Sequence, residues 1–114
     1  MSDTSTSQSS LVVRECLLKA RAGDTAARDR LFAACRSYLG LIARANVQPW
    51  LRTKVDASDL VQQTMLDAHR DFHRFRGESD QEWLAWLRRI AARNALDAAK
   101  RWRGAAKRDA GREV

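Results

Sequence analysis

Apolar residues in the second half of this 114-residue chain recur at steps of three and four, which constrains the fold more than any other feature. Such steps place side chains on one face of an α-helix. One row lies in a helix predicted to open at Asp56 or Ser58, and a second lies in a helix predicted from Ser79 or Asp80 to Trp102. The rows are Val61, Met65, Ala68, Phe72 and Phe75, and Trp83, Leu87, Ile90, Asn94 and Ala98.

The first half predicts two further helices. Ser9 or Ser10 is expected to cap a helix that begins at Leu11 and ends at Gly23, and Asp24 to cap another that runs to about Asn46. Their inward rows are predicted as Leu11, Arg14, Leu18 and Ala22, with Leu17 alongside, and as Ala27, Leu31, Ala34, Tyr38, Leu41 and Ala45. Pro49 marks a loop over residues 47–55, from which Trp50 and Leu51 are expected to fold back on the core. The predicted fold class is all-α, a compact bundle of about four helices.

The length fits a single domain. Residues 1–9 are rich in serine and threonine and are expected to be a disordered tail, since they have little apolar surface to bury. The helical domain is expected over residues 10–103. Residues 104–114 are interpreted as a frayed helix end or the start of a linker.

Charge is segregated along the chain, whose formal net charge is +7. Residues 56–82 hold seven acidic side chains against three basic ones, whereas residues 86–112 hold nine basic against two acidic. A basic balance points to nucleic acid, and the segregation points to two surfaces for two partners. The basic run is Arg88, Arg89, Arg93, Lys100, Arg101, Arg103, Lys107 and Arg108.

The basic run has a plain interpretation as a solvated helix face whose last cations complement the helix dipole. Asp97 alone offsets it before Asp109, however, and three tryptophans share its helix. Cations beside aromatic rings are typical of single-strand binders, although most of these rings are expected in the core. Trp102 is the best candidate for an exposed ring.

The acidic segment Asp56–Gln63 also has a plain interpretation, as a helix N-terminus. That explains Asp56 and Ser58, but it explains Asp59, Gln62 and Gln63 less well because they lie deeper in the helix. A carboxylate and two amides beside an apolar rim suit contact with a basic protein partner.

Enzymatic and metal chemistry are not expected. No nucleophile elbow, glycine-rich phosphate loop or catalytic carboxylate pair occurs. His69 and His73 are four residues apart, but no third ligand is evident, so a solvated or partly packed pair is favoured. Cys16 and Cys35 lie in apolar helical patterns and are interpreted as buried thiols. We therefore predict no enzyme activity, no cofactor and no metal.

No segment is apolar enough to span a membrane, and the polar N-terminus is unlike a signal peptide. A soluble cytoplasmic protein without membrane contact is predicted.

Two segments at a characteristic separation resemble region 2 of extracytoplasmic-function (ECF) sigma factors, in the sigma-70 superfamily of bacterial RNA polymerase. They are DASDLVQQTMLDAHRDFHRFRGES (56–79) and WLAWLRRIAARNALDAAKRWR (83–103). Family members show an Asp-x-x-Asp-Leu-x-Gln helix, an Arg-Phe-Arg-Gly loop and a Trp-Leu-x-Arg-Ile-Ala helix. The resemblance covers about residues 10–103.

The resemblance implies that the chain binds the β′ clamp helices of core RNA polymerase through the helix with Asp56, Asp59, Leu60, Gln62 and Gln63. Many relatives carry Glu where this chain has Gln63. The loop Arg76–Asp80, with Arg76, Gly77, Glu78 and Ser79, would capture a base flipped from the non-template strand of the promoter −10 element. The following helix would hold the melted single strand through Arg88, Arg89, Arg93, Asn94, Lys100 and Arg101. An anti-sigma factor is a further possible partner.

Family members normally continue into region 4, a helical domain that reads the −35 element. Nothing after Gly104 can supply it, so we expect either a chain cut in the linker or a natural single-domain form. The alternative hypothesis is a helical protein–protein adaptor or regulator without promoter-melting activity. Such an adaptor would not compete with an authentic sigma factor for core polymerase. A general nucleic-acid-binding domain is a third hypothesis, and it would tolerate changes at Asp59 and Gln62.

Overall fold

The chain is a bundle of α-helices, shown by a computed structural model that describes residues 3–112, with side-chain burial for residues 12–108 and 111. No strand occurs between residues 3 and 112, so the predicted all-α class is confirmed. The elements in chain order are α1 (Asp3–Arg21), α2 (Thr25–Asn46), the 3-10 turn η1 (Pro49–Leu51), α3 (Ala57–Asp71), the 3-10 turn η2 (Phe72–Arg74) and α4 (Asp80–Arg112).

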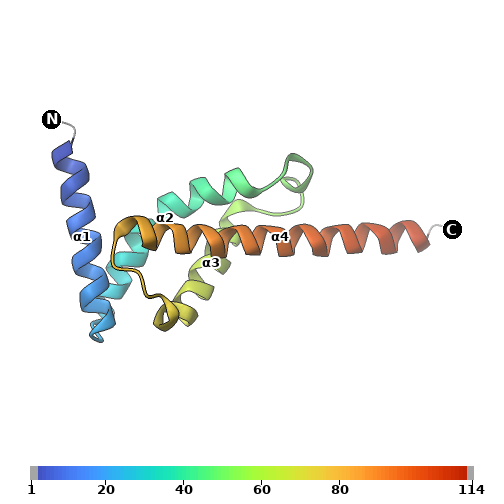
Figure 1. The fold of residues 1–114 in the computed structure, drawn as a ribbon. Coiled ribbons are helices and arrows are strands. Elements are labelled where there is room, and N and C mark those ends of the chain that lie inside the picture. The colour runs from blue at the N-terminus through green and yellow to red at the C-terminus, as the bar shows by residue number, and fades with distance from the viewer. Residues whose placement is uncertain (1–2, 113–114) are drawn as a thin grey trace.

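Helices α2, α3 and α4 pack against one another, and α1 crosses one end of this group (Figure 1). The contacts of α1 are mainly with α2, with a smaller contact to α4. Helix α4 lies across the other two, and its C-terminal turns extend past them (Figure 1). This arrangement agrees with the predicted bundle of about four helices.

The turn between α1 and α2 forms as the sequence predicts. Gly23 has φ +103°, a backbone conformation that L side chains rarely adopt. The N–H of Gly23 donates to the carbonyl of Ala20, and that of Asp24 to the carbonyl of Lys19, which is the Schellman pattern of a helix C-terminus. Asp24 then caps α2, because its side chain accepts from the N–H of Ala27 at 3.0 Å.

The outer helices are longer than predicted. Helix α1 begins at Asp3 instead of Leu11, so residues 3–9 of the predicted disordered tail have a helical backbone, while residues 1 and 2 lie outside the described range. Helix α4 continues to Arg112, ten residues past the predicted end at Trp102. Extending an existing helix needs only one hydrogen bond per residue fixed. A single glycine such as Gly104 costs about 1 kcal/mol relative to alanine, too little to end a helix whose next residues favour it.

The predicted inward rows of α3 and α4 are confirmed. Val61, Ala68, Phe72 and Phe75 are buried, Met65 is half-buried, and all five predicted residues of α4 are buried. Trp83 is completely buried and packs its ring against those of Phe32, Phe72, Phe75 and Trp86, at centroid distances of 5.3 to 5.8 Å. This aromatic cluster lies at the end of the bundle that carries the 75–80 loop.

The predicted row of α1 is wrong wherever side-chain burial is described, since Arg14, Leu18 and Ala22 are all exposed, while the side chain of Leu11 lies outside the described residues. The predicted row of α2 is wrong in part. Leu18 is 56% exposed and Leu41 is 65% exposed, whereas Leu17 and Leu39 are buried. In α2 a second row also follows steps of three and four, and beyond Leu31 this row faces inward. It comprises Phe32, Cys35, Leu39 and Ile42. Two overlapping apolar rows satisfy the helical period equally, so only the neighbouring helices decide which one is buried.

Candidate nucleic-acid and protein interface

The first two turns of α3 present polar side chains to solvent. Asp56 is the N-cap and accepts a hydrogen bond from the N–H of Ser58 at 3.1 Å. Asp59, Gln62 and Gln63 are exposed on the helix that follows. Leu60 is only 6% exposed and belongs to the core, so it supports this surface from beneath. Of the five residues predicted to dock on polymerase, four are therefore accessible.

Asp59 stands between two hollows. One, of about 700 Å³, is bounded by the end of α2, residues 52–56 and the start of α3. The other, of about 500 Å³, lies between α3 and α4, and we call it the α3–α4 hollow. Asp59, Lys54 and Val55 line both hollows, so these three residues form the ridge between them, and Asp59 supplies its carboxylate.

The α3–α4 hollow brings together residues that the sequence assigned to separate surfaces. Gln63 from the docking helix lines it, and so do Asn94 and Arg101 from α4. Trp102 closes it and is 39% exposed, with the ammonium of Lys54 lying 5.5 Å from the centroid of its ring. The ring predicted to be the best exposed is thus engaged with a cation on one side.

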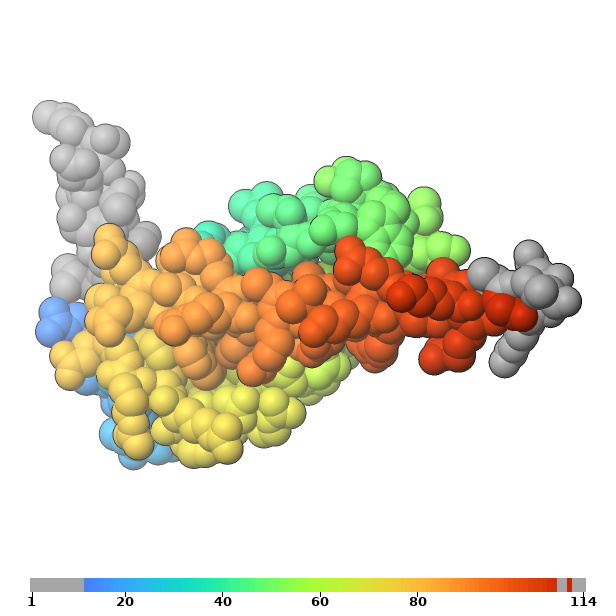
Figure 2. All heavy atoms as spheres, turned by 45° about the vertical axis from the view of Figure 1, so that its right-hand side comes forward, coloured from blue at the N-terminus to red at the C-terminus, as the bar shows by residue number. Residues whose placement is uncertain are grey.

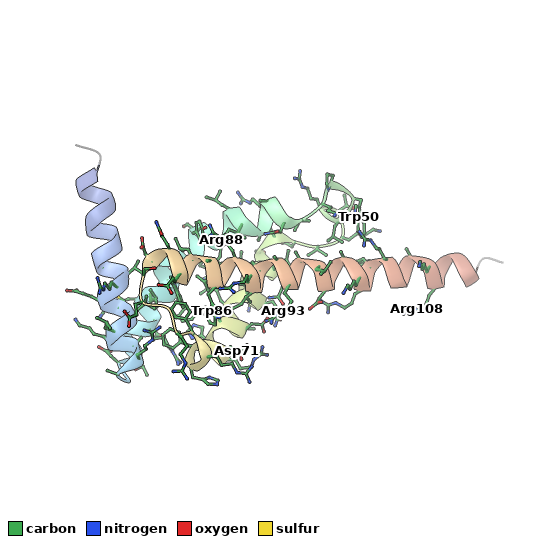
Figure 3. All side chains as sticks on the ribbon, viewed as in Figure 1. Trp50, Asp71, Trp86, Arg88, Arg93 and Arg108 are labelled. Atoms are coloured by element: carbon green, nitrogen blue, oxygen red, sulfur yellow. The ribbon has the colours of Figure 1, made fainter. Side chains whose placement is uncertain are left out.

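The other exposed tryptophan also contacts a cation. Trp50 in η1 is 42% exposed, and the guanidinium of Arg103 lies 5.5 Å from the centroid of its ring. Its neighbour Leu51 is 1% exposed. The prediction that both residues fold back on the core therefore holds for Leu51 alone, while Trp50 lies against α4 near the surface (Figure 3).

The loop between η2 and α4 alternates in burial. Phe75 and Gly77 are buried, whereas Arg76 and Glu78 are exposed. A Cβ atom on Gly77 would lie 2.6 Å from Cζ of Phe75 and 2.7 Å from Cβ of Glu82, so any other residue here would force a neighbouring group to shift. The loop therefore presents Arg76 and Glu78 outward from a tightly packed backbone.

Ser79 ends the loop as the cap of α4. Its Oγ accepts from the N–H of Glu82 at 3.1 Å and lies 3.1 Å from Glu82 Oε1, to which it donates. The N–H of Glu78 lies 3.5 Å from the same carboxylate oxygen. This reciprocal use of a serine and a glutamate three residues later is a capping box. Ser79, predicted in the base-capturing loop, thus has a structural role at the helix start.

Helix α4 carries a row of exposed cations along the face opposite its buried row. Its members are separated by four, seven, three and four residues, so they share one face. Leu96, 51% exposed, is on the same face. In the space-filling view α4 runs across the front of the molecule, leaving this face open (Figure 2). We call these residues the outer row: Arg89, Arg93, Lys100, Arg103 and Lys107.

The remaining predicted strand-binding residues of α4 are Arg88, Asn94 and Arg101, and they lie outside the outer row. Arg88 and Arg93 leave the helix on opposite sides, toward α2 and α3 respectively (Figure 3). Arg88 Nη1 donates to the hydroxyl of Tyr38 on α2 at 3.0 Å. Arg101 is exposed and lines the α3–α4 hollow. Asn94 is only 9% exposed, and its Nδ2 donates to Thr64 Oγ1 at 3.3 Å. The structure therefore places Asn94 mainly in the interface between α3 and α4.

A further hollow, of about 580 Å³, lies between the end of α3, η2 and α4, and charged groups line it. Arg70 donates to Asp71 through Nε at 3.2 Å and through Nη2 at 3.1 Å. This hydrogen bonding lowers the pKa of Asp71, and the positive charges of Arg70, Arg74 and Arg93 lower it further. Asp71 therefore faces Arg93 of the outer row across the hollow, with α3 and η2 on one side and α4 on the other (Figure 3).

Three side-chain hydrogen bonds near these surfaces were not predicted from the sequence. Asp67 on α3 is 6% exposed and accepts from Gln63 Nε2 at 2.9 Å. Thr64 is 1% exposed and pairs with Asn94. Arg21, at the end of α1, donates to the carbonyls of Phe75 and Gly77. The spacing of four residues between Gln63 and Asp67 could have indicated their hydrogen bond. No feature of the sequence indicates the contact of Arg21.

His69 and the two cysteines pack into the fold, whereas His73 does not. His69 stacks on Phe32 with ring centroids 3.7 Å apart, and burial lowers its pKa, as does the nearby charge of Arg28. His73 is exposed in η2. Both thiols are buried and unlinked, as the sequence analysis predicted, and the indole N–H of Trp83 donates to Cys35 Sγ at 3.0 Å.

Comparison with known proteins identifies relatives. The family model described as Sigma-70 region 2 matches residues 25–105. A protein named ECF RNA polymerase sigma factor SigM, from two strains of Mycobacterium tuberculosis, is 39% identical over 80 residues. The alignment covers 70% of this chain and 38% of the relative, so the chain spans well under half the length of the curated relatives it matches. No solved structure matches significantly. Among residues 3–112, no helix is both long and apolar enough to cross a bilayer.

Proposed function

The chain belongs to the sigma-70 region 2 family, and on that premise we propose that it binds core RNA polymerase and captures the non-template strand of a promoter −10 element. Sigma factors act in transcription initiation and are not enzymes, in agreement with the sequence prediction. Core polymerase and promoter DNA are accordingly its proposed partners, and the cytoplasm its proposed location. The observation that carries the proposal is the exposed outer row of cations on α4, in the same bundle as the exposed carboxylate of Asp59 on α3.

The polymerase contact is assigned to the ridge that carries Asp59, with Gln62 and Gln63 beside it. A carboxylate between two depressions suits a partner that presents two adjacent helices, because each helix can enter one depression while a basic side chain reaches the ridge. The β′ clamp is a helical coiled coil of that kind. Buried Leu60 and the Asp56 cap hold the ridge in place without taking part in the contact.

The strand contact is assigned to the outer row and to the loop before α4. Cations repeated along one helix face can follow the phosphates of a single strand, which gives affinity without sequence preference. Base preference must come from another place, and the exposed Arg76 and Glu78 of the loop supply groups that can hydrogen-bond a flipped base. Arg88 and Arg101, at the edges of the same helix, extend the positive field.

The docking assignment is tested with Asp59→Ala and a matched control, Asp29→Ala, which removes an exposed carboxylate from α2. We expect Asp59→Ala to weaken retention by an immobilised β′ clamp-helix fragment, with unchanged circular dichroism, while the control is retained like the parent chain. Equal retention of both variants would refute docking through Asp59.

The strand assignment is tested by salt dependence. Arg89→Ala and Arg93→Ala are compared with Arg30→Ala, an exposed cation of α2. Each lost phosphate contact should lower the slope of log K against log salt by about 0.7 on single strands. The same slope for all variants, or equal affinity for duplex and single strands, would remove strand capture from the proposal.

Competition separates the proposal from the alternative of a protein–protein adaptor. A chain that uses the sigma site should displace an authentic sigma factor from core polymerase as its concentration rises. An adaptor with another docking surface should form a ternary complex without displacement.

A further inference from the structure

Arg21 is the last residue of α1, and it lies outside residues 25–105, which the family model matches. Its Nη2 donates to the carbonyl of Phe75 at 3.3 Å and also to the carbonyl of Gly77. Its guanidinium carbon lies 5.2 Å from the centroid of the Phe75 ring. The Arg21 side chain therefore contacts two backbone carbonyls of the loop and also the ring of the buried Phe75.

The contact is possible because both partners are held in place. Gly23 and the Schellman turn fix the end of α1, so Arg21 leaves the helix at a defined position. On the other side, Phe75 packs against Trp83 and Trp86 with centroids 5.3 and 5.2 Å away. Phe75 and Gly77 are two apart in an extended segment, where alternate residues face the same way.

Beyond the packing of Phe75 and Gly77, the loop is held mainly at its end. Arg76 and Glu78 are exposed, and the capping box of Ser79 and Glu82 holds only its end. A charge-assisted hydrogen bond from a guanidinium is among the stronger ones, and a planar fork can serve more than one acceptor. Removing Arg21 would leave the two carbonyls to water and let the segment 75–78 move relative to α4.

From this geometry we infer that Arg21 is a positioning residue for base capture: it holds the 75–78 segment so that Arg76 and Glu78 face the strand in one arrangement. The inference rests on the proposed function. On this inference α1 influences base preference indirectly, because the proposed function includes no contact between α1 and the DNA strand. Arg21 acts through the loop and makes no phosphate contact, and this distinguishes it from the cations of the outer row.

The test uses the full chain and two labelled DNA strands of about 12 nucleotides. One is selected from a random pool by the parent chain, and the other is its shuffled counterpart. Arg21→Ala and Arg21→Gln are compared with Arg14→Ala, which removes an exposed cation from the same helix. The two Arg21 variants should lower the preference for the selected strand about ten-fold. Affinity for the shuffled strand and the salt slope should stay at the parent values.

Three results would overturn the inference. The first is an unchanged preference in both Arg21 variants. The second is an equal loss in Arg14→Ala, which would mean that charge alone matters. The third is a salt slope lowered by about 0.7 in the Arg21 variants, which would mean direct phosphate contact. Failure of the proposed function would look different, because the parent chain itself would then show no preference among single strands.

Discussion

The side-chain amide of Asn94 donates to the hydroxyl of Thr64 at 3.3 Å, and this buried pair joins α4 to α3. The helix proposed to hold the strand is thereby fixed against the helix proposed to dock on polymerase. Thr64 is 1% exposed and Asn94 is 9% exposed, so water has little access to either. The hydrogen bond therefore contributes to the relative placement of the two surfaces.

Thr64→Val should destabilise the fold by about 1–3 kcal/mol, because valine keeps the shape but leaves the Asn94 amide without its partner. Urea denaturation followed by circular dichroism measures the change. The double variant Thr64→Val with Asn94→Leu should cost less than the sum of the single changes, since it removes both polar groups. Strict additivity would mean that the two side chains do not interact.

Gly77→Ala should destabilise the chain by about 1–3 kcal/mol, because the added methyl group overlaps Phe75 and Glu82 and forces the loop to shift. Gly104→Ala is the matched control within α4, where the new Cβ meets nothing nearer than Arg108 Nη1 at 3.9 Å. The control should stabilise by about 0.5–1 kcal/mol, since alanine favours a helix more than glycine does. Thermal denaturation of the two variants should shift in opposite directions, and a shift in the same direction would contradict the described packing.

The stack of His69 on Phe32 should make stability depend on pH. Because the pKa of His69 in the folded chain is below its value in the unfolded chain, the unfolded state binds more protons in acid. Stability should therefore be fully present above about pH 6.5 and be lost as the pH falls through the folded pKa. Denaturation midpoints across this range measure the effect. His69→Phe should remove this component while keeping a ring on Phe32, whereas His73→Gln, at an exposed site, should retain it.

Burial of the Cys35 thiol makes the stability of the core sensitive to alkali. Burial raises the pKa of the Cys35 thiol, and the hydrogen bond from Trp83 offsets part of that rise. The unfolded thiol therefore ionises first, and stability should decline as the pH rises above about 8.5 toward the folded pKa. Cys35→Ser keeps an acceptor for the indole N–H but does not titrate in this range, so its stability should lack this decline. The difference between the two denaturation curves at high pH is the measurement, and parallel curves would contradict the prediction.

Much of the fold follows from short stretches of sequence. Asp24, Asp56 and Gly23 mark helix ends because capping and left-handed turns depend on a few adjacent residues. The rows of α3 and α4 were predicted residue by residue, since each helix has one dominant apolar face. The charge segregation and the family resemblance are likewise properties of the sequence, and the family match confirms the latter.

Other features were decided only when the helices packed. Which of two apolar rows of α2 faces inward, and whether Asn94 meets a strand or Thr64, depends on the neighbouring helix. Arg21 reaches Gly77 across 56 residues, and Asp59 stands between hollows formed by three segments. Periodicity and caps extend over a few residues, so the sequence alone determines the helices. The surfaces depend on contacts between distant residues, and those arise only from the tertiary packing of the four helices.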